Sequence, residues 1–537
     1  MGAERTDMAA GGTSRRALLA MIGTVAGSAA MYHAMTRLGF AADSTYRGLP
    51  NLQGAPPGST VLVLGAGLAG LTAALELRKA GYQVEVLEYQ QRAGGRNWTL
   101  RGGDIVTELG GGVQHVGFDA GQYVNPGPWR IPYHHAAVLD TCRRHNVALE
   151  PFIQVNNNAL LHNSRAFGGK PVRWREIQAD FQGHVAELLG KVTNAGALDG
   201  SVSKDDKELL LEALRQWGAL DRNMAYVANR ASSERRGYAS PPGGGIAGAP
   251  RFSDPLSRED VLDSRLWVWL AEAFIYEFQT TMFQPVGGMD AIGKALFAAL
   301  GPEAIRFGRK VTEIRQDADG VRVVHVDAAQ GGEALTSTAQ WCVCTIPLTV
   351  LSQTQIDCSP ALRAAIDAVP YFSVVKAGLQ FKRRFWEEDD GIFGGISYTD
   401  LPITSISYPS HGAFSGGKAV LQGAYAWENP ASYALTSLDP AERVRQIVEH
   451  GAALHPQYLH EYENGVAVAW HRVPWTLGCA GNWSDEARRD HYADLCALDN
   501  RLILAGEHAS YLPAWQEGAI LSALDAIERL HRRVMGG

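Results

Sequence analysis

The sequence has no excess of basic charge, no cysteine pattern and no long apolar run, and each absence excludes a class of protein. Its 49 basic and 56 acidic side chains give a net charge of −7, so it lacks the basic stripe that binds nucleic acid. The six cysteines show no C-x-x-C spacing, and we expect neither a metal site nor a disulfide framework. No segment reaches the roughly 18 to 20 apolar residues that span a membrane.

The remaining composition is that of a globular enzyme. The chain has 537 residues, of which 46% are hydrophobic and 20% charged. At about 150 residues per domain, this length predicts two to four domains. The 59 glycines are clustered, which indicates loops that approach a ligand closely.

The amino terminus has the pattern of an export signal. Two arginines, Arg15 and Arg16, precede an uncharged stretch of small and apolar residues at 17–31, and small residues follow at Ala41 and Ala42. This order predicts a twin-arginine signal peptide over residues 1–42 and a mature protein in the periplasm or outside the cell. A membrane anchor is the alternative, but the stretch is short and interrupted by Gly and Ser.

The strongest local pattern is a βαβ unit. Residues 60–64 predict a buried strand, 65–70 a glycine turn, 71–80 a helix and 83–87 a second strand. Strand, turn and helix in this order are typical of a nucleotide-binding fold.

Each glycine of the turn has a physical task. Gly65 permits a tight turn, Gly67 lets the backbone approach a pyrophosphate, and Gly70 lets the helix pack on the strand. Leu68 and Ala69 complete the turn, and the amino end of the helix that follows offers N–H groups to the phosphates. We therefore expect these residues to bind a dinucleotide.

Glu88 ends the second strand, 23 residues after Gly65. A carboxylate at this distance accepts hydrogen bonds from the ribose hydroxyls of an adenosine. The pattern up to this point does not distinguish NAD from FAD.

A second glycine pair follows, and it favours FAD. Arg92, Gly95 and Arg96 belong to the motif Arg-Ala-Gly-Gly-Arg, and Glu-Leu-Gly-Gly-Gly stands at 108–112. This arrangement resembles the extended flavin fingerprint of the amine oxidase superfamily, and the resemblance implies a loop that wraps the FAD pyrophosphate. The alternative interpretation of these residues is a basic turn with a glycine hinge.

The carboxyl-terminal part resembles the same superfamily. Residues 501–508 predict a strand that ends in glycine and Glu507, and a helix begins near Trp515. The resemblance implies that Glu507 contacts the ribityl chain and that the helix points its amino end at the isoalloxazine ring. It also implies that Val311 places a backbone group against the adenine.

The resemblance implies an α/β fold. Its FAD-binding domain is Rossmann-like and discontinuous, over residues 56–112, 284–347 and 490–534. A mixed-sheet and helical substrate-binding domain is expected over residues 113–283, which are largely helical, and 348–489.

Two segments between these pieces have no assigned role. Residues 204–230 predict an amphipathic helix, because charged and apolar residues alternate at helical spacing. Residues 231–255 predict a polar loop, and the alternatives of a lid, an oligomer contact and a solvated loop stay open. We expect a homodimer.

Arg130 points to a substrate that carries a carboxylate. It lies in Tyr-Val-Asn-Pro-Gly-Pro-Trp-Arg at 123–130, which resembles the segment of L-amino-acid oxidases whose arginine binds the substrate carboxylate. A buried carboxylate needs a fork of donors, for which arginine is the fitted residue. An arginine that caps the helix expected after Pro132 is the alternative.

A tyrosine is expected as the second carboxylate donor. Tyr408 lies in a stretch that resembles the family's carboxylate-binding segment. If the alignment with the family is shifted by one residue, the alternatives are Tyr371, Phe372 and Tyr398.

Lys376 is predicted to face inward from a strand at 374–381. The resemblance implies a lysine linked through a water to the reactive flavin nitrogen, where its charge favours electron transfer to dioxygen. A surface lysine on an edge strand is the alternative. Ala514 and Trp515 resemble the segment whose backbone carbonyl receives the substrate amine and whose aromatic ring walls the slot.

The sequence therefore predicts an FAD-dependent L-amino-acid oxidase, a flavoprotein oxidoreductase. It would convert an amino acid, dioxygen and water to a 2-oxo acid, ammonia and hydrogen peroxide by hydride transfer to the flavin and hydrolysis of the imine. A decarboxylating amino-acid monooxygenase and a monoamine or polyamine oxidase are the alternatives. The acceptor of the ammonium proton stays open between solvent and four histidines: His115, His134, His135 and His508.

The position of Cys479 raises the question of a covalent bond to the flavin. Its segment resembles the one in monoamine oxidases where a cysteine forms a thioether to the flavin, but Leu477 replaces one of the preceding glycines. We therefore expect noncovalent FAD.

Overall fold

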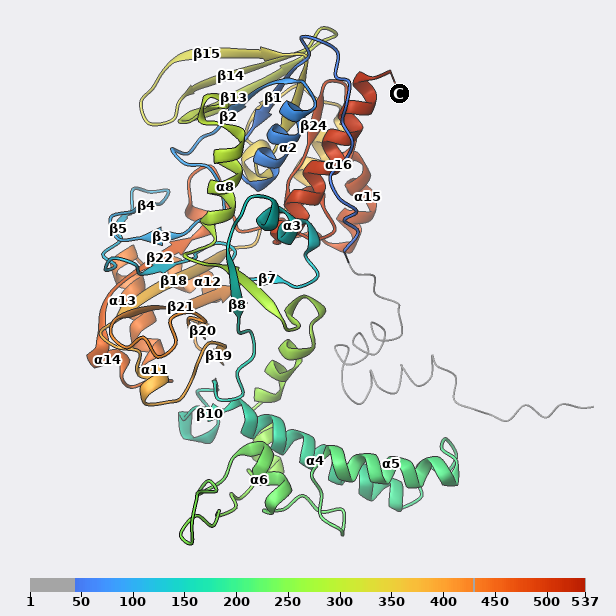
Figure 1. Cartoon of the computed structure of the whole chain (residues 1–537), viewed down its shortest axis with the longest axis vertical. Coiled ribbons are helices and arrows are strands. Elements are labelled where there is room, and N and C mark those ends of the chain that lie inside the picture. The colour runs from blue at the N-terminus through green and yellow to red at the C-terminus, as the bar shows by residue number, and fades with distance from the viewer. Residues whose placement is uncertain (1–43, 428–429, 537) are drawn as a thin grey trace, which may run out of the picture. The chain divides into compact units, whose positions relative to one another are not determined.

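The computed structural model describes residues 44–427 and 430–536, which divide into two compact units. One unit holds Gln154–Gln279, and the other holds Ser44–Ile153 with Thr280–Gly537 (Figure 1). Residue 113, expected as a domain boundary, thus lies inside the larger unit. The predicted signal peptide lies outside the described residues.

The larger unit contains the predicted nucleotide-binding sheet. Its order is β12-β2-β1-β16-β24-β23, with parallel pairing from β12 to β24 and an antiparallel β23 at the edge. The bounds are β12 (Ile305–Arg306), β2 (Gln83–Leu87), β1 (Thr60–Leu64), β16 (Trp341–Cys344), β24 (Leu502–Leu504) and β23 (Leu498–Asp499). Strands from three distant parts of the chain therefore build one sheet, as the discontinuous domain requires.

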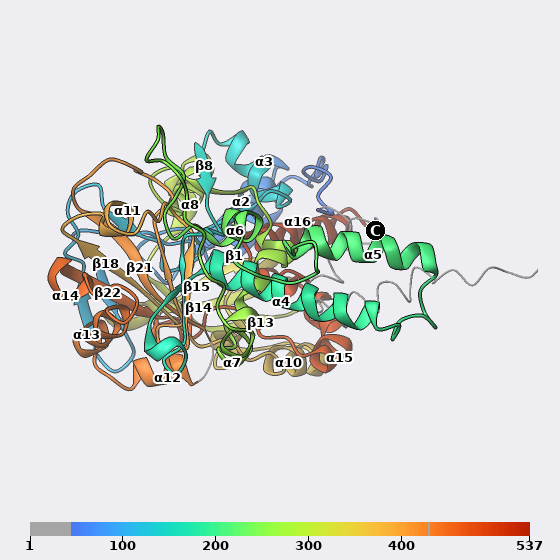
Figure 2. The same cartoon turned by 90° about the horizontal axis from the view of Figure 1, so that it is seen from below.

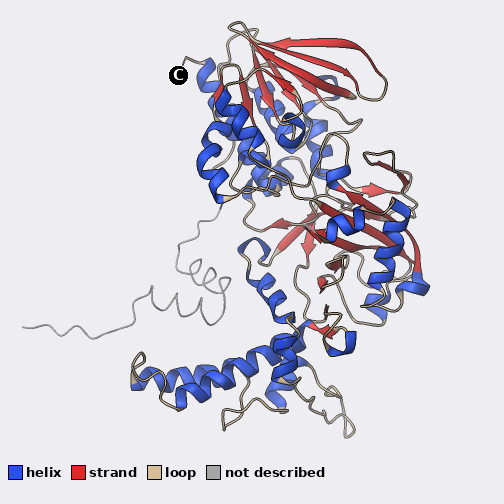
Figure 3. Ribbon diagram, turned by 180° about the vertical axis from the view of Figure 1, so that it is seen from behind, coloured by secondary structure: helices blue, strands red, loops and turns tan. Residues whose placement is uncertain are grey.

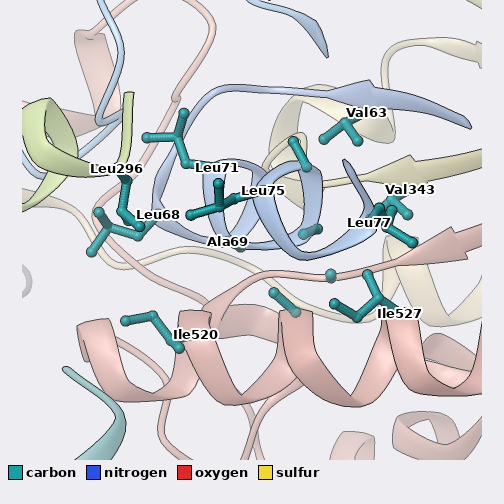
Figure 4. Packing of buried hydrophobic residues seen from close by; sticks show 14 of the residues in the cluster. Val63, Leu68, Ala69, Leu71, Leu75, Leu77, Leu296, Val343, Ile520 and Ile527 are labelled. Carbon is teal, nitrogen blue, oxygen red and sulfur yellow. The ribbon is translucent and has the colours of Figure 1, made fainter. Parts of the chain in front are cut away.

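Helices pack on this sheet through apolar side chains. Figure 4 shows members of the buried cluster: Leu68 and Leu71 from α2, Leu296 from α8, and Ile520 and Ile527 from α16. The helices of this layer are α2 (Leu68–Lys79), α8 (Asp290–Leu300), α16 (Gln516–Val534) and α3 (Ala136–Arg144). Helix α2 begins three residues before the position expected from the sequence.

A second sheet of the same unit is antiparallel except for its parallel β13–β17 pair, and its long strands are plain in Figure 3. Its strands are β15 (Gly331–Ala339), β14 (Val321–Asp327), β13 (Arg309–Gln316) and β17 (Gln355–Ile356). Strands β13 and β14 form a hairpin, with Asp319 and Gly320 in its turn.

A further sheet, with antiparallel pairing from β19 to β22, holds the predicted lysine strand. Strand β18 pairs with β21 on one edge and β22 on the other, and all of its residues are buried. The strands run in the order β19 (Ile396–Thr399), β20 (Ser405–Ser407), β21 (Ala419–Trp427), β18 (Val374–Phe381) and β22 (Tyr462–Ala469). Helices of this region are α11 (Phe385–Glu388), α12 (Ala431–Thr436), α13 (Pro440–Gly451) and α14 (Tyr458–Glu461). Lys376 is therefore on a central strand, and the edge-strand alternative is wrong.

Short strands hold the segment that carries Arg130. Strand β6 (Tyr123–Val124) pairs with β3 (Leu100–Arg101), and β7 (Ile131–Pro132) pairs with β11 (Met282–Pro285). Strand β11 also pairs with β8 (Leu149–Phe152), and β4 (Ile105–Thr107) pairs with β5 (Val113–His115). Arg130 is thus fixed between two paired strands.

The smaller unit is mainly helical, as expected. Helices α4 (Trp174–Asn194) and α5 (Lys204–Trp217) pack side by side (Figure 2), with α6 (Arg230–Arg236) and α7 (Arg258–Asp263) against α4. The helix predicted over 204–230 ends at Trp217, because Gly218 closes it and Ala219 takes a left-handed φ of 52°. The first part of the predicted 231–255 loop is helical as α6. Within the described parts of the chain, no helix is both long and apolar enough to cross a membrane.

Candidate active site

The glycine turn after β1 has the shape of a phosphate cradle. Gly65 has a φ of +104°, and a Cβ on Gly70 would lie 1.9 Å from the Gly65 carbonyl oxygen. Gly67 precedes the first turn of α2, which contains no acidic residue and receives no capping hydrogen bond from the Gly67 position. The amino end of α2, with Leu68 and Ala69, can therefore offer its N–H groups to a pyrophosphate.

The second glycine loop closes on the first. The Gly94 N–H donates to the Ala66 carbonyl at 2.8 Å, and a Cβ on Gly95 would meet the Gly67 Cα at 3.1 Å. Arg92 donates to the Gly95 carbonyl at 2.7 Å, and burial lowers the pKa of Arg92 to about 10. Only glycines permit this approach, so the two loops form a single cradle.

Glu88 is fixed at the edge of this cradle. Its two carboxylate oxygens accept the N–H groups of Ala66 and Gln90 at 2.6 and 2.7 Å, while burial raises the pKa of Glu88. The Arg309 N–H donates to the Glu88 carbonyl at 2.8 Å, which places the start of β13, and Val311 with it, next to this acid. The expected adenosine-contacting residues are thus neighbours.

Two aromatic residues near Glu88 were not predicted from the sequence. Tyr89 and Trp475 stack with ring centroids 5.2 Å apart, and the Lys310 ammonium lies 5.2 Å from the Trp475 ring. Trp475 lies in the segment of Cys479, but the sequence does not show its contact with Tyr89, because the two residues come from distant loops.

Glu507 links the second glycine loop to the carboxyl-terminal helix. Its carboxylate accepts the Arg96 guanidinium at 2.6 Å and the Ala514 N–H at 3.1 Å. Burial is the largest single effect and raises the pKa of Glu507, but the charges of Arg96 and His508 and the hydrogen bonds from Arg96 and the Ala514 N–H together outweigh burial and hold this pKa below its usual value. Arg96 also donates to the Cys479 carbonyl at 2.7 Å. Segments from both ends of the chain therefore meet at one ion pair.

Arg130 lies among aromatic rings. Its side chain is buried, with the guanidinium carbon 5.1 Å from the Trp129 ring centroid and 5.9 Å from that of Trp515. A guanidinium in such surroundings is poorly hydrated, which strengthens its attraction for an anion.

Lys376 faces the same tryptophan. Its ammonium lies 4.6 Å from the Trp129 ring and 4.2 Å from the Tyr425 ring, and it donates to the Gly127 carbonyl at 2.7 Å. The side chain is 3% exposed, and this burial lowers the pKa of Lys376 to about 7. The predicted inward orientation is confirmed, and Trp129 joins Lys376 to Arg130.

Ala514 and Trp515 immediately precede α16. Ala514 has a left-handed φ of 68°, and the Trp515 ring meets the His135 ring edge to face at 4.9 Å. His135 is thus the histidine that the structure places beside Trp515. His115 is exposed on β5, and burial lowers the pKa of His508 to about 4, which makes it a weak base.

Tyr408 is held by other side chains. Its hydroxyl lies 2.7 Å from the Ser397 hydroxyl and 2.6 Å from Nε2 of His455, whose Nδ1 lies 2.9 Å from Asp390. Tyr408 and Trp129 also border a cavity of about 60 Å³.

Tyr425 was missed in the sequence. It is the cross-strand partner of Lys376, and its ring meets Trp129 edge to face at 5.4 Å. A strand register is needed to bring Tyr425 and Lys376 together, and the sequence alone does not give it.

Residues 68–531 match the family of flavin containing amine oxidoreductases. The chain belongs to this family. Its cradle of two glycine loops, with Glu88 and Glu507 at the ends, fits a flavin dinucleotide.

Curated relatives include L-amino-acid oxidases from two Bothrops species. The protein from Bothrops pauloensis is 28% identical over 486 residues, which cover 88% of this chain and 89% of that protein. The protein from Bothrops pictus is 29% identical over 485 residues, which cover 88% of this chain and 90% of that protein. Among solved structures, a putrescine oxidase bound to putrescine is similar with a TM-score of 0.55 at 17% identity, over 90% of this chain and all of that one. This structural likeness confirms the fold class.

Proposed function

We propose that the protein is an FAD-dependent L-amino-acid oxidase. The observation that carries the proposal is the buried Arg130 guanidinium, within 5.1 Å of the Trp129 ring that also contacts Lys376. A simple amine offers no anion to such a guanidinium, whereas the carboxylate of an amino acid does. The names of the Bothrops relatives support the same substrate class.

In this proposal, different residues bind the carboxylate and the amine of the substrate. Arg130 holds the substrate carboxylate, with Tyr425 as the neighbouring donor in place of Tyr408. The Ala514 carbonyl receives the amine, while Trp129 and Trp515 exclude water from the slot. These contacts fix the direction of the Cα–H bond.

The cradle of the two glycine loops, Glu88 and Glu507 would hold FAD, which would supply acceptance of the hydride from the substrate Cα and transfer of two electrons, with two protons, to dioxygen to give hydrogen peroxide. Lys376 supplies a positive charge for the anion that forms in the oxygen step. His135, whose ring contacts that of Trp515, takes the ammonium proton in this proposal. The released imine hydrolyses to a 2-oxo acid and ammonia.

Three further points belong to this proposal. FAD is bound without a covalent link, the twin-arginine signal directs export to the periplasm or beyond, and the enzyme is a homodimer. Sizing of the purified holoenzyme tests the last point.

A peroxide assay over the twenty L-amino acids, their D-forms and several simple amines tests the proposed function. We expect peroxide and ammonia with L-amino acids and little with amines. Amide formation with loss of carbon dioxide would identify a monooxygenase instead, and peroxide from amines alone would identify an amine oxidase.

A further inference from the structure

Glu517, in the first turn of α16, binds the first turn of another helix. Its carboxylate accepts the backbone N–H groups of Ala137 at 3.0 Å and Val138 at 2.9 Å. It also accepts the Ser44 hydroxyl at 2.9 Å, and the Glu517 side chain is 1% exposed. A buried carboxylate thus receives three donors from two other segments.

These contacts complete the amino end of α3. The first N–H groups of a helix have no partner within the helix, and the residue before α3, His135, provides no side-chain cap. A carboxylate at this position satisfies two of these groups and interacts favourably with the helix dipole. Glu517 therefore caps α3, although it lies 379 positions from Val138 in the sequence.

Both helices adjoin the candidate active site. Helix α3 begins six residues after Arg130, and α16 begins directly after Trp515. The Trp515 ring touches His135 at 4.9 Å and lies 5.9 Å from the Arg130 guanidinium. Glu517 thus connects the segment that carries Arg130 with the helix that follows Trp515.

We propose that Glu517 is a positioning residue, which holds Arg130 in register with the start of α16 by capping α3. The inference rests on the proposed amino-acid oxidase function, since it assigns to Arg130 the substrate carboxylate. Glu517 touches neither substrate nor flavin in this account. It acts through the amino end of α3 and the six residues that lead back to Arg130.

The proposal requires a carboxylate and not merely a polar side chain. Glutamine has the same shape, but it offers one oxygen, and its NH₂ group would face an N–H group of α3. The Glu517→Gln variant should therefore loosen the α3 segment while the chain stays folded.

The experiment compares flavin-loaded wild type and Glu517→Gln by steady-state kinetics per bound flavin. Two substrates are used: the best L-amino acid and its amino alcohol, which lacks the carboxylate. We expect KM for the amino acid to rise about tenfold, with kcat lowered by less than about threefold and KM for the amino alcohol changed by less than about twofold. The visible flavin spectrum should stay as in the wild type.

Glu387→Gln is the matched control. Glu387 is also buried and accepts a backbone N–H, from Phe414 at 3.1 Å, together with the Arg384 guanidinium. This control should lower thermal stability and leave KM unchanged, which is the pattern of a purely structural carboxylate. If Glu517→Gln does not fold, Glu517→Asp, which retains the charge but is shorter by one methylene, is judged by the same criteria.

Two results would overturn the proposal. One is a KM for the amino acid that is unchanged from wild type in the Glu517 variant, as expected for the Glu387 control. The other is an equal rise of KM for the amino acid and the amino alcohol, which would mean that Glu517 does not act through Arg130. Failure of the proposed function is separate, because it is decided beforehand by whether amino acids bleach the wild-type flavin.

Discussion

The phenolic hydroxyl of Tyr408 lies 2.6 Å from Nε2 of His455, so another buried side chain engages this hydroxyl. Asp390 accepts Nδ1–H of His455 at 2.9 Å, and Nε2 of a neutral His455 is then an acceptor. Tyr408 then donates to His455 and accepts from Ser397. Its proton is engaged in the protein, whereas Tyr425 lies beside Lys376 and Trp129.

The two tyrosines should therefore respond differently to loss of the hydroxyl. Tyr425→Phe should lower kcat/KM for amino acids by roughly 10- to 150-fold, equivalent to about 1.5 to 3 kcal/mol for a hydrogen bond to a charged group. Tyr408→Phe should lower the free energy of unfolding by about 1 to 3 kcal/mol, because buried partners lose their bond, and leave KM unchanged. Steady-state kinetics and thermal unfolding of both variants separate the roles, and the reverse pattern would restore Tyr408 as the carboxylate donor.

Lys376 should impose a pH dependence on the oxygen step. Because burial lowers its pKa to about 7, the ammonium is charged below this pH and neutral above it. Reoxidation of reduced flavin by dioxygen should therefore slow as pH rises through about 7. Lys376→Met should slow reoxidation far more than anaerobic reduction by the amino acid, and should remove the pH dependence.

Stopped-flow measurement of the two half-reactions between pH 6 and 9 checks the role of Lys376. Unchanged reoxidation in Lys376→Met would assign the lysine to packing alone.

FAD should be released by acid denaturation. The nucleophile for a thioether is the thiolate, and burial raises the pKa of Cys479 to about 11, so only about one thiol in ten thousand is ionised at pH 7. After acid precipitation the yellow colour should stay in the supernatant. Colour retained in the pellet would demonstrate a covalent link, and loss of that colour in Cys479→Ser would locate it.

The export prediction concerns residues outside the described part of the chain. Replacing Arg15 and Arg16 by lysine should keep the active, flavin-loaded enzyme in the cytoplasm. Deleting residues 1–42 should preserve activity, since Ser44 and its bond to Glu517 are retained. Fractionation followed by the peroxide assay is the measurement, and export of the twin-lysine variant would contradict the signal assignment.

Local patterns predicted much of the fold, and contacts between distant segments account for what they missed. The β1 and β2 strands were predicted at their observed bounds, because a glycine turn and a buried apolar run are features of neighbouring residues. Tyr425 and Glu517 were missed, because their partners, Lys376 and α3, come from strand register and helix packing. The helix over 204–230 was predicted too long, since nothing in the periodicity marks the end at Trp217.

The central claim is that Arg130 binds the substrate carboxylate. Removing the guanidinium leaves that carboxylate desolvated and unpaired, a loss of roughly 2 to 5 kcal/mol for a buried charge pair. At about 1.4 kcal/mol per tenfold, kcat/KM for amino acids should fall by a factor on the order of 30 to 5,000 in Arg130→Ala. Arg130→Lys should not restore it, because an ammonium cannot form two parallel bonds.

The most direct measurement is therefore kcat/KM of flavin-loaded Arg130→Ala on an L-amino acid and on its amino alcohol. We predict a large loss on the amino acid, a much smaller loss on the amino alcohol, and full flavin occupancy, since the cradle of Gly65, Gly70 and Arg92 is untouched. An equal loss on both substrates would contradict the claim. The chain would then be a flavin amine oxidoreductase whose buried arginine is structural.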